Sequence, residues 1–120
     1  MPRKFAKSFE FAFHGIHYLF TTQRNFRIHL IVGIGAVLIS ALLRLSLPEF
    51  ALVVLAVFLV LVAEMVNTAI EEAVNLLVKQ HDLHAKRAKD IAAAATLLAG
   101  ICAIICGGLV WIPKIWGLFF

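Results

Sequence analysis

The sequence is poor in charged residues: only 15% of its 120 residues are Asp, Glu, Lys or Arg, whereas 62% are hydrophobic. A soluble domain of this size could not bury so much apolar surface, so we expect the lipid bilayer to be the solvent for part of the chain. The formal net charge is +4, but basic residues beside apolar segments more often set membrane topology than bind nucleic acid. The composition therefore predicts a single integral membrane domain over residues 1–120 that does not bind nucleic acid.

Cysteine is scarce, and phosphate-binding glycine motifs are missing. Cys102 and Cys106 lie one helical turn apart in an apolar run, where a disulfide is geometrically difficult, and we expect both to be buried small hydrophobic residues. The sequence has no Gly-rich loop of the Walker type. The first 29 residues also lack the apolar core and small-residue cleavage site of a secretory signal peptide. A nucleotide would therefore have to be held by side chains rather than by a backbone cradle.

The apolar pattern predicts four helical segments. Over residues 3–22 apolar side chains recur with a period near 3.6 and form a Phe-rich face beside lysines, which is typical of a helix lying in the membrane interface. Three longer apolar stretches should cross the membrane, at residues 28–46, 47–79 and 85–112. The second is about 45 Å long and exceeds a bilayer core of about 30 Å, so its end should emerge into water. Pro48 suits the first turn of this helix. The predicted fold class is all-α, with three transmembrane helices and an N-terminal amphipathic helix.

Lysine and arginine are distributed unevenly among the predicted connections. The first 29 residues carry five of them, residues 79–89 carry four, and the turn at residues 44–49 carries one. Because cytoplasmic connections are enriched in Lys and Arg, we expect the N-terminus and the second connection to lie in the cytoplasm. The C-terminus should lie outside the cell membrane.

Polar residues of the second span share one helical face. At 100° per residue, five side chains fall within an arc of about 100°: Glu64, Asn67, Thr68, Glu71 and Asn75. They follow fourteen residues without a polar side chain, so Glu64 should lie near the lipid boundary. Ionisable groups at that depth are costly and usually face a partner or a cavity. We therefore regard these five residues, the polar stripe, as the candidate site.

Lys89 and Asp90, at the start of the third span, should reach the same membrane boundary as the polar stripe. Carboxylates and a lysine can support phosphoryl transfer, in which one carboxylate activates a hydroxyl, another holds Mg²⁺ and the lysine offsets phosphate charge. Two other interpretations fit the same residues. A long helix that leaves the membrane must become polar somewhere, and the carboxylates could instead serve an ion- or proton-coupled transporter or assembly subunit.

The chain also resembles the small prokaryotic diacylglycerol kinase and undecaprenol kinase family. The family signature runs Glu, any residue, apolar, Asn, Ser or Thr, small, apolar, Glu, two residues, apolar, Asp, and the chain matches it at every specified position from Glu64 to Val74. The resemblance extends to Ala88-Lys89-Asp90 and to residues 25–29, Asn-Phe-Arg-Ile-His. It covers nearly the whole chain and its order of elements.

This resemblance implies a function and a set of roles. It implies a homotrimer with active sites between subunits at the cytoplasmic face, where ATP with Mg²⁺ phosphorylates a lipid alcohol, diacylglycerol or undecaprenol. Glu64 would be the catalytic carboxylate and Glu71 would bind Mg²⁺. Asn67 would hold substrate and phosphate, and Lys89 and Asp90 would bind the phosphates of the nucleotide.

Two positions depart from the family pattern. Gln23 stands where members commonly carry a glutamate of the metal site, so Mg²⁺ binding should depend more on Glu71 or recruit Glu72. Asn75 replaces the last aspartate of the signature and bears on any nucleotide contact made there. Neither departure affects Glu64, and we keep the prediction of a lipid kinase.

Overall fold

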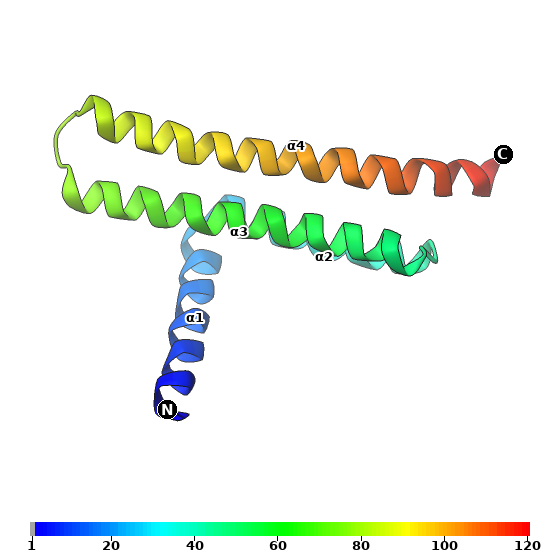
Figure 1. Cartoon of the computed structure of the whole chain (residues 1–120), viewed down its shortest axis with the longest axis horizontal. Coiled ribbons are helices and arrows are strands. Elements are labelled where there is room, and N and C mark those ends of the chain that lie inside the picture. Colours follow the sequence, from blue (N-terminus) through cyan, green and yellow to red (C-terminus); the bar gives the residue numbers. More distant parts are fainter. Residues whose placement is uncertain (1) are drawn as a thin grey trace.

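The computed structural model describes residues 2–120, which form four helices joined by short connections (Figure 1). Helix α1 spans Pro2–Thr22, α2 spans Arg24–Leu42, α3 spans Leu47–Leu77 and α4 spans Leu83–Phe119. Within these described residues there is no β-strand. The all-α fold class predicted from the sequence is confirmed.

Three of the helices form an elongated bundle, and the fourth leaves it. α3 and α4 lie side by side and antiparallel, α2 packs along α3, and α1 departs at a steep angle to all three (Figure 1). The apolar face of α1 is exposed to its surroundings, including Phe5, Phe9 and Phe13. This arrangement suits a helix that lies along the membrane surface while the other three cross the bilayer.

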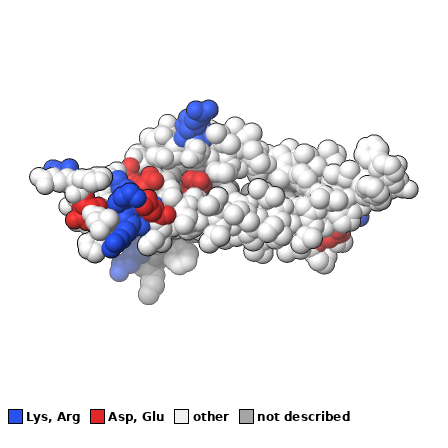
Figure 2. Space-filling model, turned by 90° about the horizontal axis from the view of Figure 1, so that it is seen from above, with Lys and Arg blue, Asp and Glu red and all other residues white. Residues whose placement is uncertain are grey.

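The helices α2, α3 and α4 are each long and apolar enough to cross a membrane. Few of their side chains are buried within the chain, and most large apolar side chains face outward, as expected where lipid is the solvent. Charged residues gather mainly at the end of the bundle where α3 leads into α4, next to a long uncharged stretch (Figure 2). The chain is a multi-pass membrane protein.

The turn between α2 and α3 is defined by its own residues. Ser46 caps α3: its Oγ accepts a hydrogen bond from the Glu49 backbone N–H at 3.4 Å, and Glu49 Oε1 accepts one from the Ser46 backbone N–H at 3.0 Å. Pro48 lies in the first turn, as predicted, where its missing N–H costs nothing. Arg44 adopts a φ of 55°, a left-handed conformation that is uncommon outside glycine and that ends α2.

The connection between α3 and α4 comprises residues 78–82. Asp82 caps α4 by accepting a hydrogen bond from the Ala85 backbone N–H at 3.0 Å. That bond, to an ionised acceptor, lowers the pKa of the Asp82 carboxyl below its usual value. The cap fixes where α4 begins, and therefore where the side chains of its first two turns lie relative to α3.

The first span and the end of the third span differ most from the sequence-based expectation. The first span was expected at residues 28–46, yet α2 spans Arg24–Leu42, and only Gln23 leaves the helical conformation before it. The hydrogen bonds Gln23 N–H to Leu19 C=O and Arg27 N–H to Gln23 C=O continue the ladder on both sides of this break. Helix α4 passes through Pro113 and ends at Phe119 instead of near residue 112.

Small residues bring the spans together. Ala92 and Ala99 are buried on α4, whose contacts are mainly with α3, because small side chains let helices approach closely in lipid. Gly33 is buried on α2, directly opposite Val57 of α3. Both cysteines are free, and Cys102 is exposed on α4. The expectation that Cys102 is buried was therefore wrong, because that face of α4 has no neighbouring helix within the chain.

Candidate active site

The polar stripe runs along α3 from a buried end to an exposed one. Glu64 and Thr68 are buried, Asn67 and Glu71 are half-buried, and Asn75 is exposed. The hydroxyl of Thr68 donates a hydrogen bond to the backbone carbonyl of Glu64 at 3.0 Å and so does not engage the Glu64 carboxylate. At 1.5 Å per residue, Glu64 lies about 10 Å from Glu71 and about 16 Å from Asn75 along the helix.

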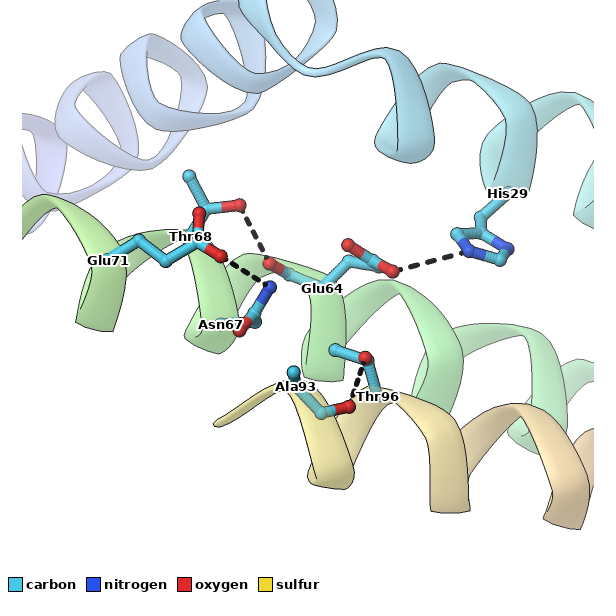
Figure 3. A network of polar contacts seen from close by, with 7 residues as sticks. All are labelled: His29, Glu64, Asn67, Thr68, Glu71, Ala93 and Thr96. Atoms are coloured by element: carbon cyan, nitrogen blue, oxygen red, sulfur yellow. Dashed lines mark hydrogen bonds and ion pairs between the residues drawn. The ribbon is translucent and has the colours of Figure 1, made fainter. Parts of the chain in front are cut away.

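The carboxylate of Glu64 points toward α2, where it meets His29 (Figure 3). Glu64 Oε1 lies 3.3 Å from His29 Nε2. The two side chains differ in exposure, since 38% of the His29 side chain and 11% of the Glu64 side chain are accessible. The buried carboxylate therefore has a partner of complementary chemistry, as its depth requires.

Asn67 and Glu71 form a second polar pair, one helical turn apart (Figure 3). Asn67 Nδ2 donates to Glu71 Oε1 at 3.4 Å, while the buried Asn67 Oδ1 has no hydrogen-bond partner. A buried amide oxygen without a partner, beside a carboxylate, is a donor set that suits a hard cation such as Mg²⁺. Within residues 2–120 no three His, Cys, Asp or Glu residues come close enough to form a metal cluster. Such an ion would thus depend on phosphates and water for its other ligands.

At the exposed end of the polar stripe, α4 contributes its charges. Lys89 Nζ donates to Asn75 Oδ1 at 2.6 Å, and Lys86 Nζ forms an ion pair of 2.6 Å with Asp90. Lys86, Lys89 and Asp90 line an open pocket of about 210 Å³ between the end of α3 and the start of α4. Lys89 is therefore brought to the stripe as predicted, whereas Asp90 pairs along its own helix with Lys86.

Among the described residues, Glu72 and Gln23, the two other candidate metal ligands, form no hydrogen bond with Asn67 or Glu71. Glu72 Oε1 accepts a hydrogen bond of 2.9 Å from the hydroxyl of Tyr18 on α1. Gln23 is the N-cap residue of α2, and its side chain makes no capping bond. In a single chain, then, Glu72 ties α1 to α3, and Gln23 has no observed link to the stripe.

Sequence reasoning assigned no role to His29 or Tyr18. His29 belongs to the segment 25–29 that matches the family. The sequence therefore marked this segment, but it did not indicate that His29 contacts Glu64. The bond from Tyr18 to Glu72 joins residues 54 positions apart, and nothing in the sequence indicates that these two residues meet. Both contacts depend on how the helices cross, which apolar periodicity does not specify.

An apolar groove of about 490 Å³ opens between α2, α3 and α4. His29 lies at one end, Trp111 lies at the other, and Gly33, Ala56 and Gly107 are among the small residues between them. Trp111 Nε1 donates a hydrogen bond of 3.0 Å to Ser40 of α2, which is fully buried. The site around Glu64 thus adjoins a hydrocarbon-like surface on one side and the charged end of the bundle on the other.

Comparison with known proteins agrees with this arrangement. The family model for prokaryotic diacylglycerol kinase matches residues 10–111. Over 110 residues the chain is 46% identical to a diacylglycerol kinase of Synechocystis, covering 90% of this chain and 62% of that protein. It is 35% identical over 112 residues to the undecaprenol kinase of Bacillus subtilis, covering 93% of this chain and 91% of that protein.

A more distant relative is the diacylglycerol kinase of Escherichia coli K12, 28% identical over 113 residues, with 94% of this chain and 89% of that protein covered. The chain spans less than two thirds of the Synechocystis relative and about nine tenths of the other two. The family match covers all three apolar helices up to Trp111 and the whole polar stripe. On this evidence the chain belongs to the prokaryotic diacylglycerol kinase family.

Proposed function

We propose that this protein transfers the γ-phosphate of ATP to the hydroxyl of a membrane lipid alcohol, either diacylglycerol or undecaprenol. The observation that carries the proposal is the polar stripe, which places the buried Glu64 beside apolar surface and Asn75, bound to Lys89, at the charged end. A lipid hydroxyl and a nucleotide phosphate could approach one helix from these two ends. The names of the relatives from Synechocystis and Bacillus subtilis support the same reaction class.

In this proposal each polar residue has a distinct task. Glu64 accepts the proton of the lipid hydroxyl as its oxygen attacks the γ-phosphorus. Asn67 Oδ1 and Glu71 would hold Mg²⁺, which offsets negative charge on the phosphates. Lys89 binds the phosphates through its ammonium group, and Asp90 helps to organise them once its contact with Lys86 is exchanged.

The proposal includes the orientation and a homotrimer. Of the eleven Lys and Arg residues, four lie where α3 meets α4 and five lie in α1 and at the start of α2, and both regions would face the cytoplasm, where ATP is present. Within one chain Lys89 is bound to Asn75, about 16 Å along α3 from Glu64. The homotrimer, with active sites between subunits, rests on the family resemblance, and in this arrangement the phosphates of ATP would lie between the depths of Lys89 and Glu64.

The direct test is phosphate transfer by the purified protein in mixed micelles. Labelled ATP and Mg²⁺ are supplied with diacylglycerol in one series and undecaprenol in the other, and lipid phosphate is measured in both. We expect transfer to at least one alcohol and its loss in Glu64→Gln, with the oligomer intact by size-exclusion chromatography. A wild-type protein inactive on both alcohols would overturn the proposal, and a fully active Glu64→Gln would remove Glu64 from its catalytic role.

A further inference from the structure

We propose that His29 is a positioning residue that works through Glu64: it takes up the proton that Glu64 removes from the lipid hydroxyl and passes it to water. The inference rests on the proposed function and deepens it, because it names how the carboxylate returns to its reactive form. It concerns a residue of α2 that the polar stripe itself does not contain.

The contact between the two side chains is the first observation. His29 Nε2 lies 3.3 Å from Glu64 Oε1, within reach of a shared proton once the pair tightens on substrate binding. Among the hydrogen bonds and ion pairs of residues 2–120, His29 is the side chain that engages the Glu64 carboxylate. Thr68 bonds to the backbone of Glu64, and Asn67 bonds to Glu71.

The difference in exposure is the second observation. The Glu64 side chain is 11% accessible and the His29 side chain 38% accessible. A proton accepted by Glu64 therefore lies in a site nearly closed to water, while the imidazole next to it has an open side. Histidine can receive a proton on one ring nitrogen and release one from the other. The pair thus provides a path from the buried carboxylate to solvent.

Among residues 2–120, no other charged side chain forms a hydrogen bond or ion pair with the side chains of His29 and Glu64. On α3 the next ionisable group of the same face is Glu71, which accepts a hydrogen bond from Asn67. On α2 the guanidinium of Arg27 donates to the backbone carbonyl of Phe20, at the end of α1. On α4, the Thr96 hydroxyl donates to the Ala93 carbonyl, and neither residue carries a charge (Figure 3). Glu64 is therefore the titratable group that faces His29.

The step balances in protons and electrons. The lipid oxygen forms a bond to the γ-phosphorus as the bond from that phosphorus to the bridging oxygen of ADP breaks, and the hydroxyl proton moves to the Glu64 carboxylate. Glu64 then passes this proton to His29 Nε2, and the imidazolium releases the proton on Nδ1 to water. The products are the lipid phosphate, ADP and one proton in solution. Both side chains return to their starting charge, and proton exchange of the two ring nitrogens with water restores the starting tautomer of His29.

The test uses two substitutions at His29 in the full-length protein. His29→Gln keeps a side chain that can donate a hydrogen bond to Glu64 but cannot carry a proton onward, and His29→Ala leaves space for a small base. We expect kcat to fall at least about tenfold in both, while KM for the lipid and for ATP stays within about twofold of wild type. Adding free imidazole should restore part of kcat in His29→Ala. His29→Gln should not respond.

The pH dependence of the rescue identifies its chemical basis. The base that accepts a proton is neutral imidazole, so the rescued rate should rise with pH through the ordinary imidazole pKa of about 6.5. His14→Ala, on the exposed face of α1, is the matched control and should keep wild-type kcat with and without imidazole. Circular dichroism and size-exclusion chromatography confirm that each variant is folded.

Two outcomes would overturn the inference while leaving the lipid kinase function intact. A wild-type kcat in His29→Gln would show that a hydrogen bond alone suffices. A reduced kcat in a folded His29→Ala that imidazole fails to raise at any pH would show that His29 carries no proton. If only His29→Gln folds, its kcat decides the matter alone. A wild-type protein inactive on both lipid alcohols would instead overturn the proposed function, and this inference with it.

Discussion

Lys89 of α4 donates a hydrogen bond of 2.6 Å to the side-chain oxygen of Asn75 on α3. This contact joins the exposed end of the polar stripe to the start of the neighbouring span, across the connection at residues 78–82. It holds the lysine ammonium at a fixed height along α3, at the entrance to the open pocket between the two helices. The position of the charge that we propose to bind phosphate therefore depends on an uncharged amide.

Removing that amide should loosen the lysine without unfolding the protein. In Asn75→Leu we expect KM for ATP to rise several-fold, because the ammonium loses its acceptor and must be ordered by the nucleotide itself. Asn75→Asp should retain tight ATP binding, since a carboxylate also accepts from Lys89. Initial rates at varied ATP measure both. An unchanged KM in Asn75→Leu would show that this contact does not position Lys89.

Gln23→Glu should lower the Mg²⁺ concentration needed for the half-maximal rate. A carboxylate attracts a hard divalent cation more strongly than a neutral amide does, and the family resemblance implies a glutamate of the metal site at position 23. The measurement is the initial rate over a Mg²⁺ series at constant ATP. Gln23→Ala is the control that removes the side chain without adding charge. An equal or greater Mg²⁺ requirement in Gln23→Glu would place this position outside the metal site.

Gly33 is expected to tolerate no methyl group. A Cβ at this position would lie 2.6 Å from Cγ1 of Val57, and valine is stiff about χ1, so α2 and α3 would have to move apart. We expect Gly33→Ala to destabilise the protein by about 1–3 kcal/mol and Val57→Ala to restore much of that loss. Gly35→Ala, with nothing within 4 Å of the added Cβ, is the matched control. Thermal unfolding in one detergent compares all four proteins.

The bond from Trp111 to Ser40 links α2 and α4 at the far end of the apolar groove. Ser40→Ala leaves an indole N–H without an acceptor in apolar surroundings, which we expect to cost about 1 kcal/mol. A double-mutant cycle with Trp111→Phe isolates the contribution of this pair, measured by unfolding in a denaturing detergent. A coupling free energy near zero would show that the bond does not hold the two helices together.

The tie between α1 and α3 should be sensitive to alkaline pH. The Tyr18 hydroxyl donates to the Glu72 carboxylate, and this bond and the negative charge raise the pKa of Tyr18 above its usual value of 10.0. A raised folded-state pKa means that the contact is fully present below the ordinary tyrosine pKa and is lost as pH rises through the higher value. α1 should then become more accessible to protease at high pH.

Tyr18 is the only tyrosine in the chain, so its pKa can be read directly from ultraviolet absorbance of the phenolate. Glu72→Gln should lower this pKa toward 10.0, because the negative charge that disfavours the phenolate is gone. Glu10→Gln, also on the N-terminal side of the protein, should leave it unchanged. A Tyr18 pKa that is the same in Glu72→Gln as in the wild type would contradict the contact between the two helices.

Much of the fold could be predicted because the bilayer makes strong demands on a sequence. Lipid leaves backbone groups no partner outside the helix, so long apolar runs are helices, and their ends follow from residues such as Ser46 and Pro48. The same demand explains the errors. Residues 24–29 are helical despite their polar side chains, because the hydrogen-bond ladder continues almost unbroken past Gln23, and Pro113 does not end α4.

The site was predictable along one helix and less so between helices. The period of 3.6 placed Glu64 and Glu71 on one face of α3, and their common boundary with Lys89 followed from the length of that helix. The partners of individual carboxylates did not follow. His29 meets Glu64 and Tyr18 meets Glu72 only because α2 and α1 cross α3 at particular points, and close packing at small residues such as Gly33 sets those points.

α3 has 31 residues, about 46 Å of helix against a hydrocarbon core of about 30 Å. On the proposed function, two residues of this helix define two depths in the membrane. Glu64 defines the depth at which the lipid hydroxyl reacts, and Asn75 defines the depth of the nucleotide. The distance between Glu64 and Asn75 is fixed by the helix, whereas the depth of the lipid hydroxyl changes with the thickness of the surrounding membrane. The lipid composition of the host membrane would thereby affect how often the lipid hydroxyl reaches the γ-phosphate of ATP.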